Sequence, residues 1–337
     1  MDRQRNIDLL RIVSIFFITM HHLTINGIFN LDALSNGAYP TERLEITFFA
    51  SMLNAFLVVG VNIFFLISGY FQIKLSIKKI FFLIIYIALF YGILNLTNSI
   101  YTHKKIDFHF FTSTIMSLRR YWFVNVYILL SLASPFLNKL LETSSKLEIQ
   151  NFFIGILIVC CGYYTFISNN DGGINKGYSL VSAIYLYIIG GEFNRIGIDE
   201  NKIKTAKLLF QLALAYVCNC LLVFITLFLL KAPKRTWNLF SYTNPFVFAQ
   251  SIIIFTIFTS IHVNKKVFKL IDFFTPAILF CYIIQSSGFA IIKDNRDFLI
   301  NFSYEKFGAV TGLFSIPINA ILIVLFCTFC YNSKPET

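Results

Sequence analysis

The sequence predicts an all-α integral membrane protein, built as a bundle of about ten transmembrane helices. Hydrophobic residues make up 57% of the 337 residues and charged residues only 13%, whereas a soluble domain carries about 25% charged residues. The mean hydropathy is +0.70. The apolar residues also gather in runs of the length that crosses a bilayer, about 20 residues per helix. Residues 1–337 are therefore expected to form a single polytopic membrane domain.

Ten apolar stretches are expected to span the membrane. The first is long and lacks a small-residue cleavage site, so it is interpreted as a retained helix rather than a signal peptide. The ninth is expected to begin at Thr275-Pro276, an N-cap residue followed by a proline in the first helical turn. In chain order, the predicted spans cover residues 10–29, 47–71, 79–100, 121–141, 152–168, 178–194, 207–230, 246–262, 274–292 and 307–331.

The basic residues predict the orientation of the bundle. The formal net charge is +11, and lysines and arginines beside membrane helices set topology, so nucleic acid is not expected as a partner. An even number of spans places both termini on one side. Lysines and arginines are more frequent on that side, which predicts that both termini are cytoplasmic. The seven cysteines all lie in apolar stretches, and neither a metal site nor a bound cofactor is expected.

Polar and ionisable side chains recur along the first predicted helix. Arg11 and His22 are eleven residues apart, which returns a helix to within about 20° of the same face and separates them by about 16 Å. Asp8 can pair with Arg11 three residues later, and Asn26 shares the face of His22, whereas His21 points about 100° away. Ionisable groups in a membrane are costly and often functional. Arg11 and His22 are therefore candidate catalytic residues and the other three are supporting residues; the alternative is that His22 only packs between helices.

The second predicted helix and its cytoplasmic end supply further candidates. Asn62 lies in mid-helix, where its amide needs a hydrogen-bond partner, and Ser68-Gly69 allows close approach of another helix. Asn62 and Ser68 are taken as supporting residues. Three lysines follow at the expected cytoplasmic border: Lys74, Lys78 and Lys79. They either set topology or form a phosphate-binding rim for a nucleotide-bearing donor.

The fourth predicted helix opens with Arg119, Arg120 and Trp122. Such residues fit an ordinary interfacial belt, but two arginines on the expected outer side run against the positive-inside rule. The three residues are therefore candidates for binding an anionic or sugar acceptor. Near the end of the sixth predicted helix, Glu192 is expected to form a salt bridge with Arg195, three residues later.

Three segments occur in order along the chain, and together they carry a resemblance. They are Arg5-x-x-Asp8-x-x-Arg11 followed by ten residues and His22, then Phe64-Phe65-x-x-Ser68-Gly69-Tyr70, then Trp122-Phe123 leading to Ser134-Pro135-Phe136-Leu137. With about ten helices, this order resembles the acyltransferase-3 family. Its members are bacterial integral-membrane acyltransferases, many of which O-acetylate cell-surface polysaccharides.

The resemblance implies a reaction and a location. It implies an acyl donor, usually acetyl-CoA, reached from the cytoplasm as a co-substrate. It implies as acceptor a hydroxyl of a surface polysaccharide or of its lipid-linked precursor. It also implies that the protein itself lies in the lipid of the bacterial plasma membrane. The essential Arg and His of the family correspond to Arg11 and His22. The chain departs from the family in lacking a second R-x-x-R motif, and in reading Tyr282-Ile283-Ile284-Gln285 where many members have Tyr-Leu-Ile-His.

These observations together predict a membrane O-acetyltransferase. His22 is expected to act as the general base toward the acceptor hydroxyl, because an imidazole titrates near neutral pH. Arg11 is expected either to hold a phosphate or pantetheine-side group of the CoA donor or to fix the helix through Asp8. A covalent acyl-histidine relay is the alternative to direct transfer. The alternative from another class is a transporter or flippase for a glycan or small solute, since intramembrane polar residues also serve transport. A third interpretation is a non-catalytic partner in a polysaccharide-assembly complex.

Overall fold

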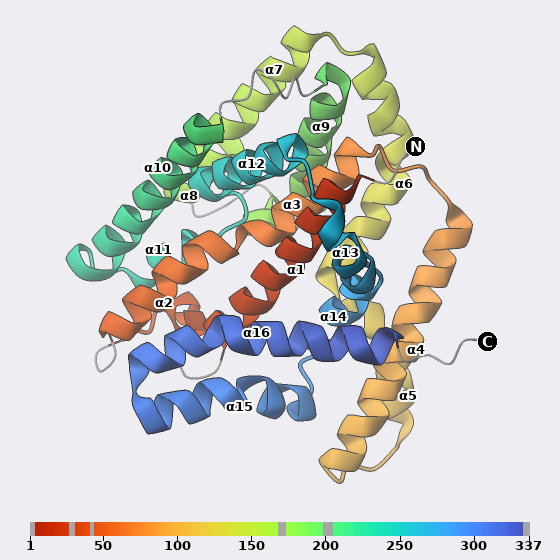
Figure 1. The fold of residues 1–337 in the computed structure, drawn as a ribbon, viewed down its shortest axis with the longest axis vertical. Coiled ribbons are helices and arrows are strands. Elements are labelled where there is room, and N and C mark those ends of the chain that lie inside the picture. The colour runs from red at the N-terminus through yellow and green to blue at the C-terminus, as the bar shows by residue number, and fades with distance from the viewer. Residues whose placement is uncertain (1–3, 27–30, 41–43, 168–172, 198–204, 333–337) are drawn as a thin grey trace.

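The computed structural model describes residues 4–26, 31–40, 44–167, 173–197 and 205–332 (Figure 1). The described residues form helices joined by turns, with no strand among them. Within the described part of the chain, eight helical segments are long and apolar enough to cross a membrane: Arg5–Ile25, Leu44–Tyr70, Ile77–Tyr101, Trp122–Thr143, Lys146–Phe166, Thr205–Leu229, Lys265–Gln285 and Val310–Asn332. The protein is therefore an all-helical, multi-pass membrane protein.

The other two predicted spans correspond to shorter helices. The span 178–194 corresponds to α9 (Leu180–Ile196), with 17 residues, and the span 246–262 to α12 (Pro245–Ser260), with 16 residues. Residues 27–29 of the first predicted span and residue 168 of the fifth lie outside the described residues. Helix α10 (Thr205–Phe224) and η7 (Ile225–Leu229) together form the spanning segment Thr205–Leu229. Short elements include η2 (Leu31–Asn36), η4 (Ile156–Tyr163), α8 (Tyr164–Phe166), η5 (Asn175–Gly177), α11 (Pro233–Asn238) and η8 (Lys265–Val267).

Helix α1 (Arg5–Ile25) lies at the centre of the bundle (Figure 1). It contacts α2 (Leu44–Leu57), α3 (Val59–Tyr70), α12, α14 (Ile278–Gln285) and α16 (Ala309–Asn332). A helix that is apolar on most sides is stable only where other helices surround it. Six aliphatic side chains of α1 are buried accordingly: Ile7, Leu10, Ile12, Ile15, Ile18 and Leu23.

Helices α3 and α9 approach each other until their backbones touch. A Cβ atom added at Gly69 would lie 1.9 Å from the carbonyl oxygen of Tyr187, and one at Gly190 would lie 2.0 Å from that of Leu66. Small residues permit such contact between membrane helices. The prediction that Ser68-Gly69 allows close helix approach is therefore confirmed, and the glycine is the residue that permits it.

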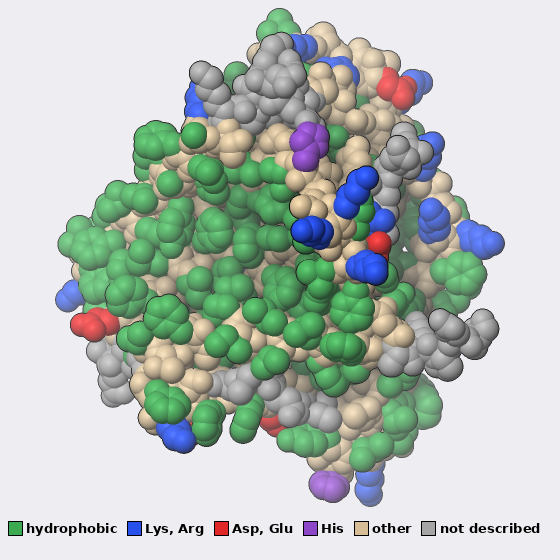
Figure 2. Space-filling model, in the orientation of Figure 1, with side chains coloured by type: hydrophobic (Ala, Val, Ile, Leu, Met, Phe, Trp, Pro, Cys, Tyr) green, Lys and Arg blue, Asp and Glu red, His purple; other side chains and the backbone are tan. Residues whose placement is uncertain are grey.

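Helix α4 (Ile77–Tyr101) lies at the margin of the bundle (Figure 1). Only four of its residues are buried, and many of its large apolar side chains are exposed, as expected of a helix that faces lipid. Helix α5 (Phe108–Ile115) returns beside it, and the short η3 (Ser117–Arg120) leads into α6 (Trp122–Thr143). Figure 2 shows apolar side chains over most of one face of the molecule, with lysine and arginine gathered over α13 (Phe268–Phe274).

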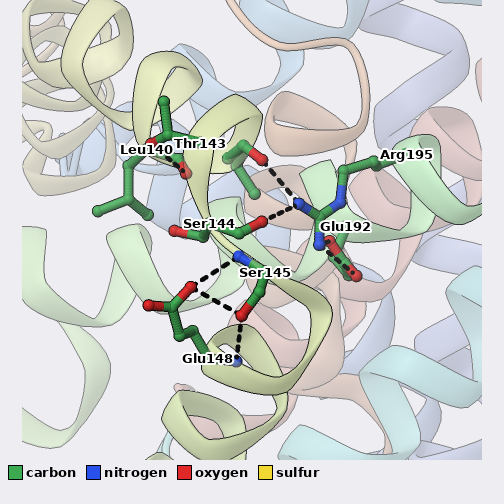
Figure 3. A network of polar contacts seen from close by, with 8 residues as sticks. Leu140, Thr143, Ser144, Ser145, Glu148, Glu192 and Arg195 are labelled. Carbon is green, nitrogen blue, oxygen red and sulfur yellow. Dashed lines mark hydrogen bonds and ion pairs between the residues drawn. The ribbon is translucent and has the colours of Figure 1, made fainter.

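The end of α9 is tied to the turn between α6 and α7 (Lys146–Gly155) by one arginine (Figure 3). Arg195 donates hydrogen bonds to the carbonyl oxygens of Leu141 at 2.9 Å and Ser144 at 2.6 Å. Its guanidinium also forms an ion pair with Glu192 at 2.7 Å. The predicted pairing of Glu192 with Arg195 is therefore confirmed.

The ninth predicted span, 274–292, differs from the structure at both ends. Helix α13 already precedes Thr275, and the Thr-Pro pair lies in a 3-10 turn, η9 (Thr275–Ala277), between α13 and α14. The Thr275 hydroxyl donates back to the carbonyl of Ile271 at 2.7 Å, so the proline marks a break in a helical segment rather than its start. Helix α14 ends at Gln285, seven residues before the predicted end.

A further helix, α15 (Ala290–Phe307), follows where the sequence analysis expects a loop. It packs beside α16 (Figure 1). Its many polar and charged residues interrupt the apolar run by which a membrane helix is recognised. Helix α15 therefore contains no apolar run long enough to be predicted as a span.

Candidate active site

A cavity of about 400 Å³ lies among five helices around the centre of the bundle. This volume is in the usual range of small-molecule sites, about 300–1,000 Å³. We call it the central cavity. Its lining residues come from α1, α3, the turn before α4, α4 itself, α6 and α14: Ile15, Ile18, Val61, Phe64, Ser68, Ile73, Lys74, Ser76, Lys79, Ile80, Leu83, Phe123, Val124, Tyr127, Ser131, Ile278, Leu279 and Tyr282.

The α1 wall of the central cavity belongs to the stripe that carries the two candidate catalytic residues. Arg11, Ile15, Ile18 and His22 follow one another at spacings of four, three and four residues, which places them on one helix face. Ile15 and Ile18 line the cavity. Arg11 and His22 flank that wall at its two ends, about 16 Å apart along the helix, and are not themselves lining residues.

Arg11 is held by neighbours at its end of the stripe. Its guanidinium forms an ion pair with Asp8 at 2.7 Å, and the side chains of Arg11 and Asp8 are 32% and 4% exposed. The guanidinium carbon also lies 5.2 Å from the ring centroid of Phe71. The predicted pairing of Asp8 with Arg11 is therefore confirmed. The partly exposed guanidinium keeps donor groups for a further anionic partner.

The two adjacent histidines occupy different surroundings. His21 is buried, and its Nδ1 lies 2.6 Å from the Oδ1 atom of Asn54 on α2. His22 is half-buried, and the two rings are 5.6 Å apart. Asn26 donates to the backbone carbonyl of His22 at 2.8 Å, so it closes the end of α1. His21 thus joins α1 to α2, whereas His22 lies on the same face of α1 as the cavity-lining residues Ile15 and Ile18.

Two of the three candidate lysines reach the central cavity. Lys74 and Lys79 line it, whereas Lys78 is exposed and is not among the lining residues. Ser68 also lines the cavity, and its hydroxyl donates to the carbonyl of Phe64 at 2.8 Å. The cavity is therefore mostly apolar, with two ammonium groups at the end where α4 begins.

Asn62 and Trp122 lie away from the central cavity walls. The Asn62 amide donates to the carbonyl of Tyr242 at 2.8 Å, which fixes α3 to the segment before α12. The Trp122 ring lies 4.5 Å from the ring of Tyr178 and 5.7 Å from that of Tyr242. Burial raises the pKa of Tyr242 well above its usual value, so this phenol stays protonated. A Cβ atom at Gly177, where φ is +97°, would lie 2.4 Å from the Cβ of Tyr242. Only glycine therefore allows the backbone at residue 177 to pack this closely against Tyr242.

The two adjacent arginines have different surroundings. Arg120 lines a second pocket, of about 520 Å³, and its guanidinium carbon lies 5.8 Å from the ring centroid of Tyr91. Arg119 is exposed and lines neither pocket. The structure thus separates the three candidate acceptor residues: Arg120 is in the second pocket, Trp122 is in an aromatic cluster, and Arg119 is on the surface.

Four polar residues that line the central cavity were not predicted from the sequence. They are Ser76 before α4, Tyr127 and Ser131 on α6, and Tyr282 on α14. Phe123, Tyr127 and Ser131 recur every four residues and share one helix face, which was a usable signal. Nothing in the sequence tells which helix that face meets. Among the described residues, no group of three or more His, Cys, Asp or Glu side chains is placed to hold a metal ion.

Comparison with known proteins gives one match. A family model described as an acyltransferase domain matches residues 4–332, nearly the whole chain. Neither the curated proteins nor the solved structures gave a match.

Proposed function

This chain belongs to the acyltransferase-3 family, and on that premise we propose that it is a membrane-embedded O-acetyltransferase. It moves an acetyl group from cytoplasmic acetyl-CoA to a hydroxyl of a cell-surface polysaccharide or its lipid-linked precursor. The location proposed is the bacterial plasma membrane, with both termini in the cytoplasm. The observation that supports the proposal most is the central cavity, whose α1 wall lies between Arg11 and His22.

The donor is proposed to enter from the end of the cavity where α4 begins. Lys74 and Lys79 line that end, and ammonium groups form strong charge-assisted hydrogen bonds with phosphate oxygens. Arg11, which is 32% exposed, supplies a guanidinium on the same side. The apolar part of the cavity then receives the pantetheine arm, which carries the thioester along the Ile15 and Ile18 wall.

The acetyl transfer is proposed to use His22 as the general base. The acceptor hydroxyl oxygen attacks the thioester carbonyl while its proton passes to the imidazole of His22, and the C–S bond breaks to release the CoA thiolate. The imidazolium then returns the proton to the thiolate, so the enzyme is unchanged after the reaction. General base catalysis of this kind contributes about 10²- to 10⁴-fold to a rate.

The test follows thiol release from acetyl-CoA in membranes that contain the protein, together with the mass of the surface glycan. Transfer adds one acetyl mass to the glycan and frees one thiol. His22→Ala should lower the rate about 10²- to 10⁴-fold with insertion unchanged. His262→Ala, at an exposed histidine outside the central cavity, is the matched control. Retained activity in His22→Ala rejects the base assignment, and glycan movement without thiol release supports the transporter alternative.

A further inference from the structure

The second pocket lies at the far end of α4, away from the lysines of the central cavity. It has a volume of about 520 Å³. We call it the α4-end pocket. Its walls come from α4, the turn that follows, α5, the end of η3 and the start of α15: Tyr91, Asn95, Asn98, Ser99, Thr102, Lys104, Lys105, Asp107, Phe110, Ser113, Arg120, Gly288, Phe289 and Ala290.

Positive charge predominates in the α4-end pocket. Lys104, Lys105 and Arg120 line it, against one carboxylate, that of Asp107. None of the three cations forms an ion pair with a described residue. The Asp107 carboxylate instead accepts a hydrogen bond from the backbone N–H of Phe110 at 3.0 Å, as the N-cap of α5. The pocket therefore holds uncompensated cationic groups that point to an anionic ligand.

The neutral wall of the pocket is held together by hydrogen bonds between α4 and α5 and carries a further hydroxyl, that of Ser99. The Asn95 amide donates to the hydroxyls of Ser113 at 3.2 Å and Thr114 at 3.4 Å, which holds α5 against α4. Ser99 also lines the pocket and is only 7% exposed. Its hydroxyl, which can donate and accept hydrogen bonds, borders the space open to a ligand.

The start of α15 also borders the α4-end pocket. Gly288, Phe289 and Ala290 line it, and α15 begins at Ala290 without a side-chain cap. Gly288 has φ of +68°, a conformation that glycine adopts freely. The first backbone N–H groups of a helix lack partners within it and attract anions, phosphate above all. This N-terminus adds to the charge of the three cations.

The flank of the pocket is apolar. Three large aliphatic side chains of α4 are exposed beside its polar residues: Ile93, Leu96 and Ile100. In a membrane, such a surface lies against hydrocarbon chains. A ligand that fits both parts has an anionic head and a hydrocarbon tail.

We propose that the α4-end pocket binds the phosphate or diphosphate head of a lipid, with the tail along α4. Lys104, Lys105, Arg120 and the α15 N-terminus bind the phosphate oxygens, and Ser99 donates one further hydrogen bond. Resting on the proposed function, this lipid is the carrier of the acceptor glycan, so the acceptor is a lipid-linked phosphate. An ordinary phospholipid headgroup offers the same chemistry, and the experiment separates the two.

The experiment measures lipid binding to the full chain in detergent by native mass spectrometry. The probes are a polyprenyl diphosphate, phosphatidylglycerol and inorganic diphosphate. The variants are Lys104→Gln/Lys105→Gln and Arg120→Gln. Each should weaken polyprenyl diphosphate binding roughly tenfold or more, since each removes a charge-assisted hydrogen bond. The matched control is Lys265→Gln/Lys266→Gln, an adjacent pair of exposed lysines outside both pockets, whose affinity should equal that of the unaltered chain.

The outcomes distinguish the two lipid sources. Binding of polyprenyl diphosphate that phosphatidylglycerol does not displace supports a carrier-lipid site. Equal displacement by phosphatidylglycerol supports a phosphate-headgroup site and overturns the carrier assignment. Unchanged affinity in both variants overturns the pocket itself. Thiol release from acetyl-CoA is measured on the same preparation: a chain that binds the carrier but never releases thiol rejects the proposed function and leaves the pocket standing.

Discussion

Replacing Arg11 with glutamine removes the guanidinium from the ion pair with Asp8, whose side chain is only 4% exposed. The N–O distance is 2.7 Å, and Coulomb's law with an effective dielectric constant of about 20 gives an attraction of about 6 kcal/mol. Desolvation offsets part of that attraction, and loss of one partner from a buried pair costs about 3–5 kcal/mol. Because Arg11 is 32% exposed, we expect Arg11→Gln to lower the free energy of unfolding by the lower end of this range, about 3 kcal/mol.

The second variant, Asp8→Asn/Arg11→Gln, separates the structural role of Arg11 from its role toward the donor. The double change removes both charges, so no buried carboxylate is left that has lost its arginine partner. We expect the free energy of unfolding, measured by SDS titration in mixed micelles, to recover most of the lost 3 kcal/mol or so. We expect both Arg11→Gln and the double variant to transfer acetyl slowly and to have a raised KM for acetyl-CoA, because both lack the guanidinium proposed to bind the donor.

Two results would refute this reasoning. If the double variant is as unstable as Arg11→Gln alone, then the ion pair is not what stabilises the start of α1. If the double variant recovers acetyl transfer together with stability, then Arg11 serves only to neutralise Asp8 and does not bind the donor.

The remaining predictions concern α3, the cavity lysines and His21. Gly69→Ala should destabilise the chain by at least about 1–3 kcal/mol, because the new Cβ would lie 1.9 Å from the Tyr187 carbonyl; a thermal midpoint equal to that of the unaltered chain would contradict the α3–α9 contact. Lys79→Gln should raise the KM for acetyl-CoA several-fold more than Lys78→Gln, and equal values would argue against donor binding at the cavity end. His21→Ala should cost roughly 1–3 kcal/mol of stability, since a buried amide on α2 loses its partner; a rate loss with unchanged stability in unfolding titrations would instead assign His21 to the chemistry.

The sequence predicts well whatever depends on one segment alone. The apolar runs locate the long helices, and the 3.6-residue period aligns Arg11, Ile15, Ile18 and His22 on one face. The Asp8–Arg11 and Glu192–Arg195 pairs follow from a spacing of three residues within one helix. The limits of the ninth span were wrong because a Thr-Pro pair fits a 3-10 break as well as a helix start. Helix α15 was not predicted because its charged residues leave no apolar run of membrane-spanning length.

Contacts between helices could not be predicted from the sequence. His21 meets Asn54, and Tyr127 lines the central cavity, only because particular faces of α2 and α6 turn toward α1. Many pairings of membrane helices bury comparable apolar area, so hydrophobicity does not select among them. Arg119 and Arg120 show the same limit within two residues, because one side chain enters a pocket and its neighbour does not.

The backbone contact at Gly69 and Gly190 makes the walls of the central cavity mechanically unequal. Helices α3 and α9 interlock and cannot slide past each other without separating. Helix α4 is held by few buried side chains, among them Ile87 and Tyr91. For the acetyl-CoA donor proposed above, we therefore expect entry by sideways displacement of α4 into the lipid, and we expect the fluidity of the surrounding bilayer to affect the loading rate.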